Sequence, residues 1–122
     1  MSLKKTVLLV DDDIDLLENT AYMIKSLGCD VVTAENGQDA VEKYKEISPD
    51  LTLMDVKMPK MDGFDAFFKI KQFDSEAKIV LITAFAVDEK KHLKAKSMSL
   101  LATINKPYSF EQLEDIVTKF TD

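Results

Sequence analysis

The chain has 122 residues, of which 46% are hydrophobic and 31% charged, which suits a globular protein with a proper core. Its formal net charge of −6 argues against direct binding to nucleic acid, because phosphates would be repelled. No apolar run reaches the roughly 18 residues that span a bilayer, no signal peptide precedes the first apolar segment, and the single cysteine, Cys29, excludes an internal disulfide. We therefore expect a cytoplasmic protein without membrane association, folded over residues 1–122 as one domain.

Five short apolar segments have the length and the β-branched content of buried strands. The third begins after a Pro-Asp turn signal and ends on a carboxylate, Asp55. All five are apolar almost throughout, which is typical of parallel strands covered on both faces. In chain order, the predicted strands cover residues 6–10, 30–34, 51–55, 78–83 and 100–104.

Apolar residues recur at three- and four-residue spacing after each predicted strand, which indicates helices packed on a sheet. Short polar residues that can cap a helix precede most of these segments, and Ser109 with Gln112 has the spacing of a capping box. The fourth helix, over residues 87–98, is weakly patterned and rich in lysine, and its His92 is expected to be solvated. The other helices are expected to begin at Asp13 or Asp15, at Asn36-Gly37, at Asp62-Gly63 and at Ser109.

Strand and helix thus alternate five times along the chain. Short connections and right-handed crossovers convert this alternation into a parallel sheet with helices on both faces. The sequence therefore predicts an α/β fold with a doubly wound, five-stranded parallel sheet in a three-layer sandwich.

Polar side chains lie at or just beyond the carboxyl ends of four of the predicted strands: Asp11, Asp12, Asp55, Thr83 and Lys106. The carboxyl ends of parallel strands share one edge of the sheet, where ligands collect. Carboxylates about 4 Å apart repel by roughly 4 kcal/mol per pair at an effective dielectric constant near 20, so a cation must neutralise them. Lysine and a divalent ion such as Mg²⁺ can do so, and a carboxylate in that setting is a plausible nucleophile toward a phosphoryl group.

The segments VLLVDDD, LMDVKMPKMDG, ITA and NKP occur in this order. Together they resemble the receiver domain of bacterial two-component response regulators, of the chemotaxis-regulator type, over essentially the whole chain. The resemblance implies a flavodoxin-like (βα)5 fold with strand order 2-1-3-4-5.

The same resemblance implies a phosphoacceptor signalling protein rather than an enzyme that turns over a substrate. Asp55 is expected to accept a phosphoryl group from a sensor histidine kinase or a phosphotransfer protein, and Thr83 and Lys106 to contact that group. The expected ligands of Mg²⁺ (or Mn²⁺) are Asp12, Asp55 and the backbone carbonyl of Lys57, with Asp11 acting through water.

Two further features bear on signalling. Lys57 and Phe85 occupy positions that vary in the family and are expected to tune the lifetime of the phosphoryl group. The segment KSMSLLAT, before Lys106, lacks the usual glycine, and Thr103 stands where the family usually has an aromatic residue. The spacing from Thr83 to Lys106 is also about one residue longer than usual, so the switch expected of that aromatic residue is in question.

Three alternatives stay open at this point. Asp11-x-Asp13 mimics the nucleophile motif of haloacid-dehalogenase-type phosphatases, which would place the reaction on Asp11. A flavin-binding flavodoxin would share the fold, but three aspartates after the first strand would repel its phosphate. A degenerate receiver that acts only as a protein-binding module is the third.

Overall fold

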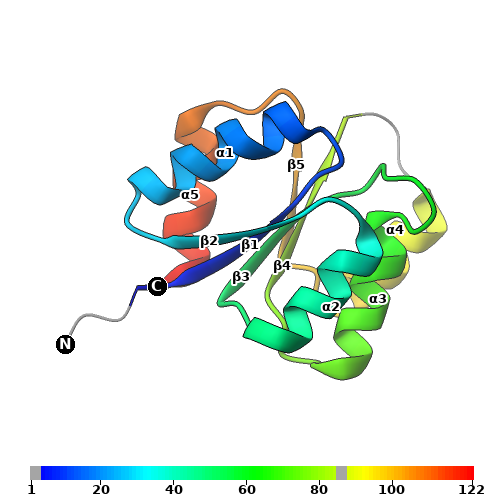
Figure 1. Ribbon diagram of the computed structural model, residues 1–122. Helices are drawn as coiled ribbons and strands as arrows, with labels where there is room; N and C mark the ends of the chain where they lie inside the picture. Colours follow the sequence, from blue (N-terminus) through cyan, green and yellow to red (C-terminus); the bar gives the residue numbers. More distant parts are fainter. Residues whose placement is uncertain (1–3, 85–87) are drawn as a thin grey trace.

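The computed structural model describes residues 4–84 and 88–122, in which five strands alternate with five helices (Figure 1). The strands form one parallel sheet in the order β2-β1-β3-β4-β5, as the resemblance predicted. The strands are β1 (Thr6–Val10), β2 (Asp30–Ala34), β3 (Leu51–Asp55), β4 (Ile79–Thr83) and β5 (Ala102–Asn105).

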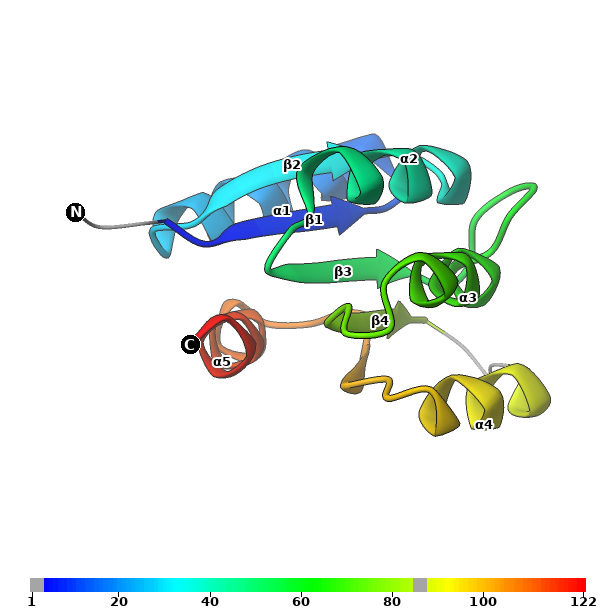
Figure 2. The same ribbon diagram turned by 90° about the horizontal axis from the view of Figure 1, so that it is seen from below.

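The helices lie on both faces of the sheet and complete the predicted three layers. α1 and α5 cover one face, and α2, α3 and α4 cover the other, which Figures 1 and 2 show from two directions. In the described part of the chain, no helix combines the length and apolar content needed to cross a membrane. The helices are α1 (Ile14–Ser26), α2 (Gly37–Ile47), α3 (Gly63–Phe73), α4 (Glu89–Ser97) and α5 (Phe110–Thr121).

Each helix begins at a short polar side chain that accepts a hydrogen bond from a free backbone N–H of the first turn. Of the two candidates for α1, the structure selects Asp13, whose carboxylate accepts from the N–H of Leu16 at 3.2 Å. The predicted capping box of Ser109 and Gln112 is present at α5. The remaining caps are Asn36, Asp62 and Asp88.

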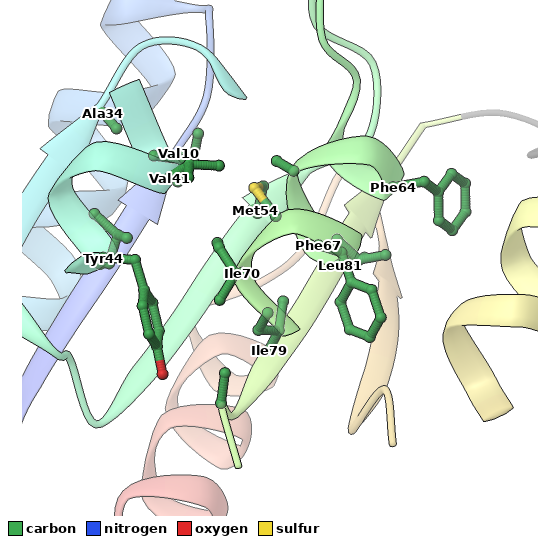
Figure 3. Packing of buried hydrophobic residues seen from close by; sticks show 14 of the residues in the cluster. Val10, Ala34, Val41, Tyr44, Met54, Phe64, Phe67, Ile70, Ile79 and Leu81 are labelled. Atoms are coloured by element: carbon green, nitrogen blue, oxygen red, sulfur yellow. The ribbon is translucent and has the colours of Figure 1, made fainter. Parts of the chain in front are cut away.

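Alternation along the strands divides the buried side chains into two cores. Figure 3 shows the core beneath α2, α3 and α4, where Val10, Met54 and Leu81 of the sheet meet Phe67 and Ile70 of α3. The second core lies beneath α1 and α5 and takes the intervening strand residues, such as those at positions 9, 53 and 82. The central strand β3 is buried along its whole length, as its apolar sequence indicates.

The β5 region departs from the prediction. β5 begins at Ala102 rather than at residue 100 and ends at Asn105, because residues 98–100 form the turn that ends α4. Ser99 has a φ of 64° there, the left-handed conformation that glycine adopts most easily. The N–H of Leu100 donates to the carbonyl of Ala95 at 3.1 Å, which closes the turn. The chain thus makes this turn with serine where the family usually has glycine.

Helix α4 is shorter than predicted, and the expectation of a solvated His92 was wrong. α4 begins at Glu89, and Val87, where we expected the helix to start, lies outside the described residues. His92 is half-buried with its ring 6.0 Å from that of Phe64, and its Nε2 is buried without a hydrogen-bond partner in the described part of the protein. The sparse apolar pattern concealed this contact because histidine itself supplies the packing surface.

Candidate functional site

The period of two along each strand explains which strand-end residues meet. Continuing the alternation past the ends of β1 and β5 places Asp11 and Lys106 on the same face of the sheet as Asp55, the face covered by α1 and α5. Three polar side chains from three parallel strands therefore converge at the carboxyl edge. The order of elements in the sequence predicted that polar residues meet at the carboxyl edge of the sheet. The alternation explains why Asp11, Asp55 and Lys106 are the ones that share a face.

Lys106 forms the centre of this cluster. Its Nζ lies 3.0 Å from Oδ2 of Asp11 and 3.0 Å from Oδ2 of Asp55. The side chains of Asp11 and Asp55 are only 4% and 6% exposed, and that of Lys106 is 19% exposed. One ammonium thus neutralises part of the charge of two buried carboxylates, which leaves a net negative site.

Additional hydrogen bonds hold both carboxylates in place. Oδ1 of Asp11 accepts the backbone N–H of Asp13 at 2.9 Å. Burial raises the pKa of Asp55 above its ordinary value, and the charge of Asp11 adds to this, while hydrogen bonds from Lys106 and the backbone of Lys57 counteract it. Burial would lower the pKa of Lys106, but its hydrogen bonds to Asp11 and Asp55 outweigh that effect and raise it.

The acidic residues form a set of oxygen donors. Each of Asp11, Asp12 and Asp55 offers a carboxylate oxygen, and these atoms lie within 4.8 Å of one another. Asp12 is exposed, whereas the other two are buried. Three hard oxygen donors that open to solvent on one side fit Mg²⁺ or Mn²⁺, which retain water in such sites.

Three of the other predicted residues lie on β4, on β5 and in the loop after β3. Thr83 is half-buried at the end of β4, one residue beyond the Ile82 that pairs with Asp55 in the sheet. Lys57 is exposed in the loop after β3. Phe85 lies outside the described residues. Thr103 is exposed on β5, where its pairing with Leu81 places it on the face of the sheet that α4 covers.

Two contacts near the site were not predicted from the sequence. A Cβ on Gly63 would overlap the carbonyl oxygen of Asp55, so the start of α3 packs directly on the backbone of the candidate acceptor. The hydroxyl groups of Thr20 and Tyr108 lie 2.8 Å apart and join α1 to the β5–α5 loop. A polar residue on the apolar face of α1 was the available signal for the second contact.

Residues 7–118 match the protein family described as the response regulator receiver domain. The chain belongs to this family. It is 38% identical over 118 residues to the chemotaxis protein CheY of Halobacterium salinarum, a match that covers 93% of this chain and 98% of that protein. It is 46% identical over 86 residues to CheY of Treponema pallidum, covering 68% of this chain but only 60% of that protein.

Solved structures agree with this assignment. A CheY-like receiver domain from Methanospirillum hungatei superposes with a TM-score of 0.89 at 25% identity, covering 96% of this chain and 93% of that one. The receiver domain is a phosphoacceptor signalling domain of two-component systems, and its family implies interaction with histidine kinases or phosphotransfer proteins.

These findings give no support to the alternative functions. The second acid of the phosphatase-like motif, Asp13, is used as the cap of α1, and its N–H donates to Asp11. Both oxygens of Asp11 therefore have hydrogen-bond partners in the described structure, Asp13 and Lys106. The flavodoxin alternative is disfavoured by the same cluster, since a net negative site repels a flavin phosphate.

Proposed function

We propose that this receiver accepts a phosphoryl group on Asp55. The observation that carries the proposal is the buried Asp55 carboxylate, which shares one lysine with Asp11 and lies in a set of three acids whose ligand atoms are within 4.8 Å. Such a site is negative and open on the side of Asp12, so it favours a cation together with a phosphoryl group. A structural cap would need neither the shared lysine nor the crowding.

The transfer requires little covalent machinery from the chain. An oxygen of Asp55 attacks the phosphorus of a phosphohistidine on the donor protein, a P–O bond forms, and the P–N bond breaks. The electron pair returns to the imidazole nitrogen, which takes up a proton. Asp55 becomes an acyl phosphate, and Lys106, already 3.0 Å from its carboxylate, can donate to a phosphoryl oxygen with a small movement.

The proposed metal is Mg²⁺, or Mn²⁺ in its place. Its ligands are Asp12, Asp55 and the backbone carbonyl of Lys57, with Asp11 acting through water. When bound, the ion offsets negative charge on the phosphoryl oxygens.

Other residues complete the proposal. Thr83, at the end of β4, donates its hydroxyl to a second phosphoryl oxygen. Lys57 and Phe85 tune how long the acyl phosphate lasts by controlling the approach of water. Phosphorylation and dephosphorylation are self-catalysed, and the chain is otherwise a regulator rather than an enzyme.

The wider role follows from this chemistry. Residues 1–122 act as one receiver unit in the cytoplasm, which takes its phosphoryl group from a sensor histidine kinase or a phosphotransfer protein. The unit does not bind nucleic acid directly, because its net charge of −6 opposes this. Phosphorylation switches the conformation of the receiver, and this change controls a downstream protein or an effector domain.

Incubation with acetyl phosphate tests the proposal, read by intact mass. We expect one added phosphoryl group that requires Mg²⁺ and disappears in Asp55→Asn. Asp30→Asn is the matched control, since Asp30 is an exposed acid at the opposite end of the sheet, and it should label like the parent protein. Labelling of Asp55→Asn at the parent rate would refute the assignment and place the nucleophile on Asp11 or Asp12.

A further inference from the structure

The short loop between β5 and α5 carries both Lys106 and the contact between Tyr108 and Thr20. Lys106 reaches the acidic cluster, and two residues later the ring of Tyr108 packs into the core beneath α1 and α5. The hydroxyl of Tyr108 lies 2.8 Å from Oγ1 of Thr20, a residue of α1 that is 1% exposed. The same four-residue connection therefore joins the reactive site to a helix 88 residues away in sequence.

Thr20 is an unusual choice for its position. It lies on the buried face of α1 beside Leu17, Ala21 and Ile24, where an apolar residue would pack without a polar group to satisfy. Threonine is also a weak helix former, so neither propensity nor packing accounts for it. The hydrogen bond with Tyr108 does, because it is directional and fixes the height of the loop along α1. Apolar contacts alone would allow the loop to slide.

Lys106 needs this fixation. Its ammonium sits on a flexible four-carbon stem, yet it must remain 3.0 Å from two carboxylates. On the β4 side, the backbone N–H of Lys106 donates to the carbonyl of Thr83 at 2.8 Å. On the other side, Lys106 and Tyr108 line a pocket of about 510 Å³ that is open to solvent, together with Leu16 and Met23, so few side chains pack against the loop there.

We propose that the Thr20–Tyr108 hydrogen bond positions Lys106 for phosphoryl transfer to Asp55. The inference rests on the proposed function of Asp55. Thr20 and Tyr108 are positioning residues, because they act on the reacting group only through Lys106. The hydrogen bond to the carbonyl of Thr83 fixes the backbone of Lys106 beside β4. The Tyr108 hydroxyl fixes the rest of the β5–α5 loop against α1.

The test measures the initial rate of labelling by acetyl phosphate with saturating Mg²⁺. Tyr108→Phe and Thr20→Val each remove one hydroxyl while retaining most of the side chain, and each should slow labelling roughly three- to tenfold, the equivalent of one hydrogen bond. The double variant should be no slower than the slower single variant. Thr20→Ser keeps the hydroxyl and should restore the parent rate. Tyr22→Phe is the matched control, because Tyr22 lies on α1 but is 76% exposed.

A second background separates positioning from general loosening of the fold. In Lys106→Met, the Thr20–Tyr108 hydrogen bond has no ammonium to position, so adding Tyr108→Phe should cause no further loss of labelling rate. The affinity for beryllofluoride, a phosphoryl mimic, is measured in four proteins: the parent, Tyr108→Phe, Lys106→Met and the variant with both substitutions. This comparison can be completed even if Lys106→Met labels slowly. Circular dichroism confirms that each variant is folded at the assay temperature.

Three results overturn the inference. If Tyr108→Phe labels at the parent rate, the hydroxyl does not position Lys106. If Tyr108→Phe causes the same loss in the Lys106→Met background, its role is structural. In both cases the parent still labels on Asp55, so the proposed function stands. If Asp55→Asn labels like the parent, the proposed function fails and the inference fails with it.

Discussion

Replacing Lys106 by methionine tests the electrostatic balance of the site. At an effective dielectric constant of 20, each 3.0 Å contact of Nζ contributes about 5.5 kcal/mol of gross attraction. Asp11 and Asp55 also repel each other, by about 3.5 kcal/mol or more at their separation of at most 4.8 Å. Most of the attraction is offset by the desolvation of the ammonium, but the variant leaves two buried carboxylates without a cation. We therefore expect Lys106→Met to lower the free energy of unfolding by roughly 3–5 kcal/mol.

Mg²⁺ should restore much of this loss, because the ion supplies the missing positive charge. At a concentration 100 times its Kd, a ligand that binds only the folded state adds about 2.7 kcal/mol. The assay is urea unfolding followed by far-ultraviolet circular dichroism, with and without Mg²⁺. Lys69→Met, which alters an exposed lysine on α3, is the control and should change stability little. A loss below 1 kcal/mol for Lys106→Met, or no recovery with Mg²⁺, would refute this account.

Three substitutions test single features of the fold by the same unfolding assay. Thr52→Val removes a hydroxyl that is buried without a partner in the described structure, so it should stabilise the protein by about 1 kcal/mol; a loss would indicate a bound water. Ser99→Gly relieves a left-handed serine and should add roughly 0.5–1 kcal/mol, and no gain would mean that the turn is unstrained. Gly63→Ala should cost about 2–4 kcal/mol and slow labelling of Asp55, because its Cβ would overlap backbone atoms; unchanged stability and labelling would contradict that packing.

Most of the fold could be predicted because its signals are local. Apolar strands, polar caps and alternating periods locate four of the five strands within one residue, and the starts of α2, α3 and α5 within one residue. β5 was misplaced by two residues at its start because an apolar segment does not show where a turn ends. The turn at Ser99 requires a left-handed backbone conformation that the sequence does not predict, since serine rarely adopts it.

The candidate site was predictable as an edge of the sheet, but its detailed contacts were not. Strand alternation explains why Lys106 reaches Asp11 and Asp55, yet the Thr20–Tyr108 bond depends on how α1 and α5 dock, which is a tertiary property. The packing of His92 on Phe64 has the same origin. Contacts between elements far apart in sequence leave only weak local traces, such as one polar residue on an apolar face.

We expect the two faces of the sheet to respond differently to the proposed phosphorylation of Asp55. Asp55 and Lys106 face α1 and α5, where the Tyr108 contact restrains the loop, so movement there is limited. α4 lies on the other face and is held more weakly: Ala95 is its only buried residue in the described structure, and Lys91 joins it to α3 through Asp62 at 3.0 Å. Segments with few buried contacts open most easily. Amide exchange with and without beryllofluoride should therefore change most in α4, and a change confined to α1 and α2 would refute this route.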